Sequence, residues 1–383
     1  MSKAKLVVEG RARLRVPVAR KPKTTNPAFE ADVFYNPEME RNRSVSVEVL
    51  KAYQKKTRRD LRIADVFSGS GVRGIRYALE VPRVSLTAFN DLDAKALKLS
   101  RENARRSGVP ARKAEFSQED ANVFLSTHSR EKFHVVELDP FGSPAPFLEN
   151  ASRALVRHNG LLSVTATDLA ALCGRFPQSC LQKYYAKPLH SNFMKETGIR
   201  ILWAAVIRAF SVENIAVTPL LSFSAQHFFK AFALTTPLSS VVKKNLEEIG
   251  FLLQCQKCAF YETVKGFKVR GKTECPYCNS ALLVAGPLWL GQLHDPAFLG
   301  FLDEGTATDA AFGSAREECG MPAFFFDVER FASFRKGIVP SPRKLVEQLK
   351  ERGFKACRTQ FSSTGVKTNA PLAEVEALLK RAP

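Results

Sequence analysis

Residues 133–147, FHVVELDPFGSPAPF, join a strand-like segment to a turn rich in proline and glycine. The segment 133–138 is short, mostly apolar and rich in β-branched residues, which is typical of a buried parallel strand. The DPFGSP sequence at 139–144 can neither continue a strand nor begin a regular helix. We therefore expect an acid and an aromatic ring on a stiff turn at the carboxyl end of a strand, where open α/β sheets bind their ligands.

The side chains of this turn suit chemistry on a nucleobase amine. Such an amine is a poor nucleophile because its lone pair is delocalised into the ring. Acceptors at its two N–H groups can orient the lone pair and receive a proton. Asp139 and the carbonyl of Pro140 are the expected acceptors, and Phe141 is expected to stack on the base. The alternative is an ordinary Asp-Pro turn that caps the next helix.

The length and charge of the chain limit the classes of protein to consider. Its 383 residues allow two or three domains, and 45% hydrophobic with 25% charged residues is an ordinary globular composition. Of the net charge of +19, residues 1–25 contribute +7 and residues 330–383 contribute +8. Two basic regions around a near-neutral middle indicate phosphate-contacting surfaces that flank a pocket. Solvated lysine faces that aid solubility are the alternative.

Membrane and secretory signals are missing from the sequence. No apolar stretch reaches the roughly 18 residues needed to span a bilayer, so we expect no membrane partner. The basic first 25 residues lack the apolar core of a secretory signal; a transit peptide is an alternative, although residues 6–15 resemble a strand. Four of the eight cysteines form two CxxC pairs, which is metal-site spacing in a reducing compartment, so we expect a cytoplasmic protein.

Strand and helix patterns repeat on both sides of the turn. A strand at 63–67 leads into SGSGVRG at 68–74, in which Gly69, Gly71 and Gly74 fit the G-x-G-x-x-G pattern that lets a backbone approach a nucleotide. Further strands are expected at 84–89, 109–116, 133–138 and 161–165. This alternation predicts a doubly wound α/β sheet.

Acids at the ends of successive strands bear on the choice between two cofactors. Asp65 and Asp91 end the first and second strands, and Asp120 follows the third. A nicotinamide dinucleotide would need the helix N-terminus for its pyrophosphate, which the glycines permit. S-adenosylmethionine has no phosphate, and its site needs acids for the ammonium, ribose and adenine groups. The three acids therefore favour the methyl donor.

Six segments resemble the tRNA guanine(26)-N2 dimethyltransferase family, and they extend from near the first residue to near the last. They are EG at 9–10, FYNPEMERNR at 34–43, DVFSGSGVRGIRYALE at 65–80, DPFGSP at 139–144, TATD at 165–168 and TGVKTNAP at 364–371. DPFGSP and TGVKTNAP are the most specific of these. The chain departs from the family pattern at Ser44, where an acid is expected, and at 195–198 (KETG), where a stretch beginning His-Glu is expected.

The resemblance implies a fold, a cofactor and site residues. The fold would be a class I methyltransferase-like sheet, closed by an antiparallel pair of strands at 215–224 and 228–234. The resemblance makes Asp139 the catalytic acid. The motifs imply that S-adenosylmethionine is held by Arg43, Arg73, Asp91, Asp120 and Ala121. The strand and glycine patterns add Asp65, Gly69 and Gly71 to the expected cofactor-binding residues.

A C-terminal α+β domain with a zinc ribbon is expected over residues 238–383, after a methyltransferase domain over residues 1–237. Two CxxC pairs separated by sixteen residues predict a tetrahedral four-thiolate zinc site, structural because no open ligand position is evident. Some members of the family lack such a ribbon, so this prediction rests on the residues themselves. The four expected ligands are Cys255, Cys258, Cys275 and Cys278.

The C-terminal end predicts an αβα unit. A helix begins at Pro342, a strand covers 354–360, a Gly/Thr/Lys loop follows, and a second helix covers 372–380. We expect this unit to contact the RNA backbone through Lys344, Lys355, Arg358 and Lys367.

The sequence thus predicts a monomeric enzyme that transfers one or two methyl groups from S-adenosylmethionine to the exocyclic N2 of guanosine 26 in tRNA. Asp139 would orient the amine and accept its proton, after the base is flipped out of the folded RNA. Three alternatives remain open. They are methylation of a different amine, such as adenine N6 in DNA or glutamine in protein; a catalytically inactive zinc-ribbon nucleic-acid-binding protein; and a nicotinamide-dependent dehydrogenase.

Overall fold

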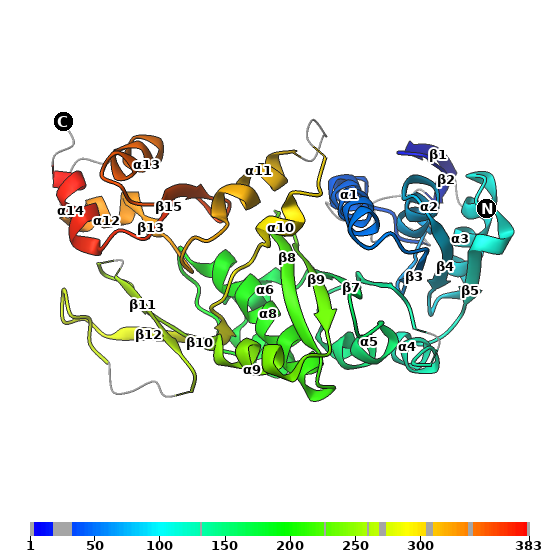
Figure 1. Cartoon of the computed structure of the whole chain (residues 1–383), viewed down its shortest axis with the longest axis horizontal. Helices are drawn as coiled ribbons and strands as arrows, with labels where there is room; N and C mark the ends of the chain where they lie inside the picture. Colours follow the sequence, from blue (N-terminus) through cyan, green and yellow to red (C-terminus); the bar gives the residue numbers. More distant parts are fainter. Residues whose placement is uncertain are drawn as a thin grey trace.

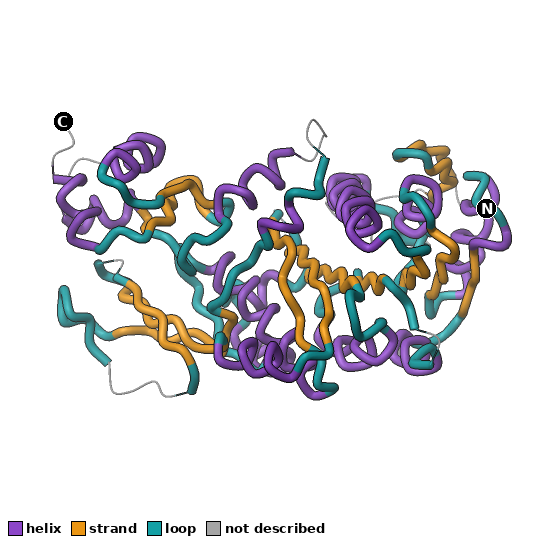
Figure 2. Tube along the Cα trace, in the orientation of Figure 1, coloured by secondary structure: helices purple, strands orange, loops and turns teal. Residues whose placement is uncertain are grey.

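A seven-stranded sheet runs through the middle of the chain in the computed structural model (Figures 1 and 2). The residues that the structure describes are 4–17, 33–130, 132–225, 227–258, 260–267, 273–303, 309–335 and 340–380. Within these ranges, no helix combines the length and the apolar character needed to cross a membrane.

The order of the seven strands is β5-β4-β3-β6-β7-β9-β8. The first five run parallel, and β9 runs antiparallel to both of its neighbours. The strands are β3 (Leu61–Asp65), β4 (Val84–Asn90), β5 (Ala114–Ser117), β6 (Val135–Leu138), β7 (Leu161–Ala166), β8 (Ala216–Ser224) and β9 (Phe229–Thr236). The predicted doubly wound sheet and its antiparallel closing pair are confirmed. Chain order reverses between β3 and β6, and a crevice at such a point is where α/β sheets bind ligands.

The sheet is buried on both faces because alternate residues of its central strands pack against different helices. Ile63, Val135 and Leu161 belong to the core beneath α1 and α2, whereas their neighbours Val136 and Leu162 belong to the core over α4, α5 and α8. Figure 1 shows α1, α2 and α3 on one face and α4, α5, α8 and α9 on the other. The helices are α1 (Glu40–Thr57), α2 (Val72–Glu80), α3 (Ala94–Arg106), α4 (Ala121–Thr127), α5 (Leu148–Ala154), α6 (Leu169–Leu172), α7 (Pro177–Tyr184), α8 (Met194–Val212) and α9 (Ser239–Glu247).

The N-terminal residues form an antiparallel hairpin of β1 (Ala4–Glu9) and β2 (Ala12–Pro17). The strand expected over residues 6–15 is therefore divided by a turn at residues 10–11. Ala12, Leu14 and Val16 are buried against α2 and α3, and the two arginines that alternate with them are exposed. The backbone N–H of Arg15 donates to Oδ1 of Asn103 on α3 at 2.7 Å. The hairpin therefore closes the end of the sheet that carries β4 and β5. Short 3-10 helices cover Pro37–Met39, Ala111–Lys113 and Ala145–Phe147.

The C-terminal part begins with a three-stranded ribbon of order β11-β10-β12. A second three-stranded sheet, of order β13-β15-β14, lies among helices (Figure 1). We call this sheet and the helices from α12 to α14, residues 326–380, the C-terminal unit. The elements are β10 (Ile249–Cys255), β11 (Tyr261–Lys265), β12 (Leu282–Trp289), α10 (Pro296–Leu299), α11 (Asp309–Glu318), β13 (Phe326–Asp327), α12 (Val328–Arg335), α13 (Pro342–Glu351), β14 (Ala356–Thr359), β15 (Ser362–Thr368) and α14 (Leu372–Lys380).

Two sequence predictions for the C-terminal unit are wrong. The expected Gly/Thr/Lys loop is strand β15, which pairs with both β13 and β14. Lys367 on this strand is 2% exposed, so it cannot be part of an RNA-contacting surface, whereas Lys344, Lys355 and Arg358 are exposed as expected. The Gly, Thr and Lys residues of this segment suggested an exposed loop. No neighbouring residue in the sequence indicated a partner that could compensate the charge of Lys367 if it were buried.

The hydrogen-bonded carboxylate partner of Lys367 lies on α8, which packs against the seven-stranded sheet. Nζ of Lys367 donates to Oε1 of Glu196 on α8 at 2.7 Å and lies 3.8 Å from the carboxylate of Glu318. Arg200, one turn further along α8, donates to the same Glu196 oxygen at 3.0 Å. Burial alone would raise the pKa of Glu196, but Lys367 and Arg200 outweigh it and hold the pKa below its ordinary value. This ion network joins the C-terminal unit to α8.

Replacing Lys367 with methionine is expected to destabilise the protein by about 3–5 kcal/mol, because it leaves buried carboxylates with less compensating charge. Urea unfolding at neutral pH measures the loss. Lys344→Met, in the same unit but exposed, is the matched control and is expected to change the free energy of unfolding by less than about 0.5 kcal/mol. Equal effects of the two substitutions would contradict the assigned network.

Candidate active site

A cavity of about 640 Å³ opens at the carboxyl ends of the central strands, where the strand order reverses. Its walls come from three sequence motifs: residues 34–43, the glycine loop at 67–73 and the turn at 139–142. Asp91, Thr167, Leu169 and His227 complete the described lining. The motifs that lie far apart in the sequence therefore meet at one site.

Asp139 lines this cavity directly after β6, and its side chain remains 20% exposed. Nη2 of Arg73, from the first turn of α2, donates to Oδ2 of Asp139. Burial would raise the pKa of Asp139, but the charges of Arg73 and Lys230 outweigh it and hold the pKa below its ordinary value. Asp139 is thus a carboxylate at neutral pH and can accept hydrogen bonds from a ligand.

A second carboxylate, Glu137, is completely buried two residues before Asp139 on the same face of β6. Nζ of Lys230 on β9 donates to its Oε1 at 2.5 Å, and the hydroxyl of Tyr77 donates to its Oε2 at 2.7 Å. Nη1 of Arg73 lies 3.7 Å from the same carboxylate. Arg73 and Lys230 together neutralise two acids, which keeps the floor of the cavity rigid and free of unpaired charge.

The turn after Asp139 is held by the end of strand β7. The backbone N–H of Gly142, at φ 85°, donates to Oγ1 of Thr167 at 2.7 Å, and the N–H of Thr167 donates to the carbonyl of Gly142 at 3.0 Å. The positive φ at this position favours glycine. Pro140 is buried, but Phe141 is 66% exposed and meets the edge of Phe34, with ring centroids 4.6 Å apart. Phe141 is thus exposed beside the carboxylate, and its stacking on a base stays a prediction.

The glycine loop has two kinds of glycine. Gly69 lines the cavity, and its N–H donates to Oδ2 of Asp91 at 2.8 Å. Gly71 and Gly74 are required for packing instead: an added Cβ would lie 2.6 Å from Oγ of Ser100 at Gly71, and 2.4 Å from the ring of Phe89 at Gly74. Only Gly69 of the three therefore brings backbone to the cavity wall.

Arg43 lines the cavity from α1, and its guanidinium group is already paired. It donates from Nε and Nη2 to the two carboxylate oxygens of Glu9, at 2.7 and 2.6 Å. Arg76 donates to the same carboxylate at 3.0 Å and to the hydroxyl of Ser44 at 3.0 Å. The EG segment at 9–10 and the segment at 34–43 are thus joined by a bidentate ion pair between Glu9 and Arg43, which fixes Arg43 at the cavity wall.

Four expected cofactor-binding residues, Gly71 together with Asp65, Asp120 and Ala121, are not among the described residues that line the cavity. Asp65 is 1% exposed and accepts the N–H of Gly74 at 3.0 Å, and burial raises its pKa to about 7. Asp120 is exposed and caps α4 by accepting the N–H of Asn122 at 2.8 Å, and Ala121 is buried behind it. Both acids therefore already serve as helix caps.

The sequence prediction missed several residues of the lining. Tyr35 and Thr167 lie in segments that carried the family resemblance, so their motifs gave a usable signal. Ser68 is buried, and its hydroxyl has no hydrogen-bond partner in the described part of the chain. His227 lies in the turn between β8 and β9, where no motif marks it.

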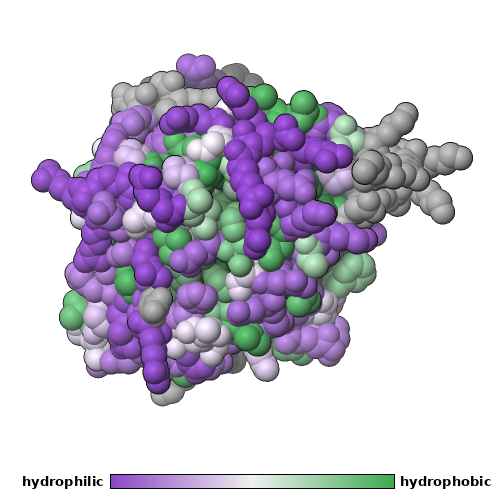
Figure 3. Space-filling model, turned by 90° about the vertical axis from the view of Figure 1, so that its right-hand side faces the viewer, coloured by the Kyte–Doolittle hydropathy of each residue, from purple (hydrophilic) through white to green (hydrophobic). Residues whose placement is uncertain are grey.

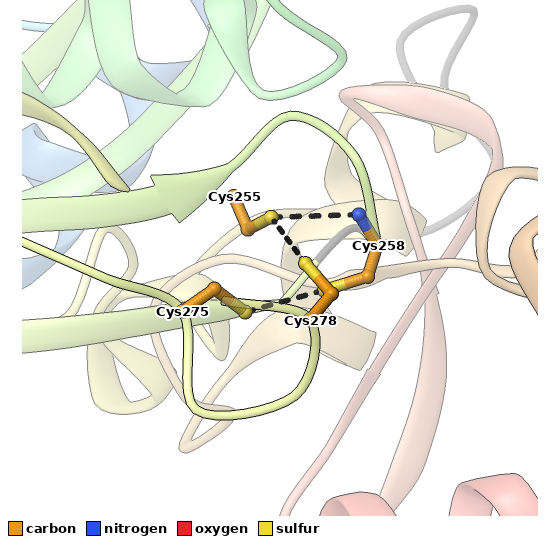
Figure 4. Close-up of side chains that lie close together, drawn as sticks. All are labelled: Cys255, Cys258, Cys275 and Cys278. Carbon is orange, nitrogen blue, oxygen red and sulfur yellow. Dashed lines mark hydrogen bonds between the residues drawn. The ribbon is translucent and has the colours of Figure 1, made fainter. Parts of the chain in front are cut away.

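The four predicted zinc ligands meet at the end of the ribbon (Figure 4), and their sulfur atoms all lie within 4.8 Å of one another. Sγ of Cys255 lies 3.4 Å from that of Cys278, and Sγ of Cys258 lies 3.4 Å from that of Cys275. Zn–S bonds of about 2.3 Å give a tetrahedron with edges of about 3.8 Å, so the cluster has the right size for one zinc ion. Backbone N–H groups of Cys258 and Tyr277 point at two of the sulfurs.

Comparison with known proteins agrees with this geometry. The model of the family "N2,N2-dimethylguanosine tRNA methyltransferase" matches residues 10–380. The chain is 38% identical to a tRNA (guanine(26)-N(2))-dimethyltransferase of Methanothermobacter thermautotrophicus, covering 97% of this chain and 98% of the relative. A tRNA (guanine(26)-N(2)/guanine(27)-N(2))-dimethyltransferase of Aquifex aeolicus is 34% identical, with 97% and 94% covered.

A solved structure of Trm1 from Pyrococcus horikoshii, in complex with S-adenosyl-L-methionine, matches with a TM-score of 0.85 at 30% identity. The match covers 98% of this chain and 100% of that one. The resemblance inferred from the six motifs is confirmed, and the chain belongs to the N2,N2-dimethylguanosine tRNA methyltransferase family.

Proposed function

We propose that this protein transfers methyl groups from S-adenosylmethionine to the exocyclic N2 of guanosine 26 in tRNA. The observation that carries the proposal is the ionised Asp139 beside the exposed ring of Phe141, in a cavity that also contains Gly69 and Asp91. The names of the relatives agree in the enzyme class and in the nucleoside.

Asp139 and the turn after it would handle the amine. The carboxylate and the carbonyl of Pro140 would accept the two N2–H bonds, and Phe141 would stack on the guanine ring. The cofactor supplies an electrophilic methyl group on a sulfonium, so one N–C bond forms as one S–C bond breaks. The nitrogen becomes acidic as it gains the methyl group, and its proton passes to Asp139 and then to water.

Four residues that line the cavity are our proposed cofactor contacts: Arg43, Gly69, Arg73 and Asp91. Asp91 accepts the N–H groups of Gly69 and Asp93 through different oxygens, and each oxygen keeps a lone pair for a ribose hydroxyl. Asp65 and Gly71 would contribute indirectly to cofactor binding, because they fix the position of the glycine loop. Asp120 and Ala121 remain predictions from the resemblance.

The tRNA would be held by basic surfaces on both ends of the chain. Figure 3 shows the end of the molecule that carries the N-terminal hairpin, where hydrophilic side chains predominate, and Arg11, Arg13 and Arg15 are exposed on that hairpin. Lys344 and Lys355 are exposed on the C-terminal unit. We assign residues 1–237, with their basic N-terminal segment, to the methyltransferase domain, and residues 238–383 to a zinc-ribbon-containing tRNA-binding domain. Contacts of this kind make affinity fall steeply with salt concentration.

The four cysteines would hold one structural zinc ion, which orders the ribbon because all four ligand positions are thiolates. Such a site contributes directly to folding.

The first test is methyl transfer from tritiated S-adenosylmethionine to unmodified tRNA transcripts that carry guanosine or adenosine at position 26. Nucleoside mass analysis is expected to find N2-methylguanosine or N2,N2-dimethylguanosine only when guanosine is present. Product at another amine would refute the assigned substrate, and no transfer by a protein that binds both tRNA and cofactor would refute the enzymatic function.

Asp139→Asn is expected to lower kcat in the same assay by about 10²- to 10⁴-fold, because the amine loses an ionised acceptor. Binding of S-adenosylmethionine, measured by calorimetry, serves to check that the site remains folded. The matched control is Asp93→Asn, which is exposed and caps α3, where asparagine is an equally good cap. A normal rate for Asp139→Asn would exclude the proposed role.

Metal analysis of the purified protein is expected to find about one zinc ion per chain. Cys275→Ser should lower both zinc content and the temperature of unfolding, and a chelator should do the same to the unaltered chain. Cys319→Ser, a free cysteine outside the cluster, should retain the metal. A full zinc content in Cys275→Ser would contradict the assigned ligands.

A further inference from the structure

A second cavity, of about 410 Å³, lies between the ribbon and the C-terminal unit, and we call it the ribbon pocket. Phe260 and Tyr261 of the ribbon line it on one side, Phe326 of β13 on another, and the turn after β15 closes it through Thr368, Asn369 and Ala370. Its volume falls within the range of small-ligand sites, roughly 300–1,000 Å³.

The walls of the ribbon pocket are mainly aromatic and apolar. The rings of Tyr261 and Phe326 have centroids 5.6 Å apart, and Phe260 packs against Tyr277 with centroids 5.2 Å apart. Phe260, Tyr261 and Phe326 are only partly buried, so part of each side chain is accessible from the pocket. Flat apolar walls of this kind suit a planar ring, as in proteins that bind single-stranded nucleic acids.

The rim of the pocket is polar and positive. Asn369 is exposed; its Oδ1 accepts the backbone N–H of Lys355 at 2.8 Å, and the structure gives its Nδ2 no partner among the described residues. The amide N–H groups are thus available to the edge of a base. Lys355, whose backbone N–H donates to Asn369, has an exposed side chain, and Arg330 of α12 reaches the carbonyl of Gln256 in the first zinc knuckle. This charge favours a polyanion over a neutral apolar ligand.

The TGVKTNAP motif connects this pocket to the rest of the molecule. Lys367 points inward to the ion network with Glu196, and the next three residues line the ribbon pocket. The elements around the pocket, β11, β13, β15 and α14, lie at the opposite end of the molecule from α1, α2 and β3 (Figure 1). A base in the ribbon pocket is therefore a different one from the base beside Asp139.

We propose that the ribbon pocket binds an unstacked nucleobase of the tRNA substrate, remote from the methylated guanosine. This inference rests on the proposed function, which supplies the tRNA. It also assigns a role to the zinc site: the N–H of Cys255 donates to the carbonyl of Phe260 at 2.8 Å, so the ordered knuckle positions an aromatic wall of the pocket.

Phe260→Ala tests the stacking wall by filter binding of unmodified tRNA at fixed salt concentration. The variant is expected to bind tRNA about 5- to 150-fold more weakly, the range for loss of one stacked base. Turnover at saturating tRNA and affinity for S-adenosylmethionine should not change. Phe267→Ala is the matched control, since Phe267 is an exposed aromatic of the same ribbon outside the described lining. Zinc analysis of both variants verifies that the knuckles are intact.

Asn369→Asp tests the polar rim without altering the turn. Aspartate keeps the oxygen that accepts the N–H of Lys355, but it replaces the amide donor with a negative charge beside the RNA. We expect at least a fivefold loss of tRNA affinity and normal stability. If Asn369→Asp and Phe260→Ala both bind tRNA with wild-type affinity and methylate it normally, this inference is refuted, whereas the proposed function is not. Failure of the unaltered protein to methylate tRNA would refute the proposed function and the inference with it.

Transcripts that lack the 3′-terminal single strand identify the source of the base. If the base comes from that strand, the truncated transcript binds weakly to the unaltered protein and Phe260→Ala causes no further loss. If it comes from a loop, truncation has no effect and the variant still binds weakly. Additive losses from truncation and substitution would also place the base in a loop.

Discussion

The guanidinium group of Arg73 is the contact on which the catalytic end of the molecule depends. It donates to Asp139 after β6 and to the side chains of Asn42 and Ser46 on α1, while its own helix begins at the glycine loop. One buried cation thus fixes α1, α2 and the end of the central strand relative to one another. Glu137 adds a second negative charge, which Lys230 balances from β9. An ion cluster of this kind is stable only when every member is paired, so the geometry of the cavity is set jointly by four elements.

The same principle operates at the junction with the C-terminal unit. Glu196, Arg200 and Lys367 form a buried network in which Glu196 and Lys367 are 171 residues apart in the chain. The two most specific motifs of the sequence therefore have different roles in the structure. DPFGSP forms a wall of the cavity at the carboxyl ends of the central strands, whereas TGVKTNAP supplies a structural cation and one side of the ribbon pocket. A motif that is typical of an enzyme family need not contact the substrate at every residue.

Local patterns in the sequence were sufficient to predict the strands of the sheet, except that the strand expected over 109–116 is limited to β5 (Ala114–Ser117), after a 3-10 helix at Ala111–Lys113. The central strands are short runs of β-branched residues, buried on both faces, and each ends at an acid or a glycine loop that is visible in the sequence. The cysteine pairs predicted the sulfur cluster for a similar reason, because the spacing of two knuckles is a local property. Strand β15 was not predictable in this way, since its Gly, Thr and Lys residues form a strand only through pairing with β13 and β14 and through a partner for Lys367 on α8.

The predicted site residues likewise depend partly on local sequence and partly on contacts with distant parts of the chain. Asp65, Asp91 and Asp120 look alike in the sequence, as acids at or after strand ends. Only the packing of the following helix decides which of them reaches the cavity. Asp65 accepts the N–H of Gly74 and Asp120 that of Asn122, whereas Asp91 accepts the N–H of Gly69 and remains at the wall. His227 has no sequence signal at all, because its position depends on how the closing hairpin turns over the cavity.

The lowered pKa of Asp139 has a consequence for how such a site can activate an amine. A carboxylate stabilised by Arg73 is a weak base, so it cannot remove a proton from a neutral amine conjugated to a purine. In the proposed mechanism its contribution would come from accepting an N–H bond, which turns the nitrogen lone pair away from the ring, and its affinity for the proton would matter only once the nitrogen carries positive charge. The pairing with Arg73 lowers the basicity of Asp139 but keeps it ionised and fixed in direction, and a site built on orientation would require both properties.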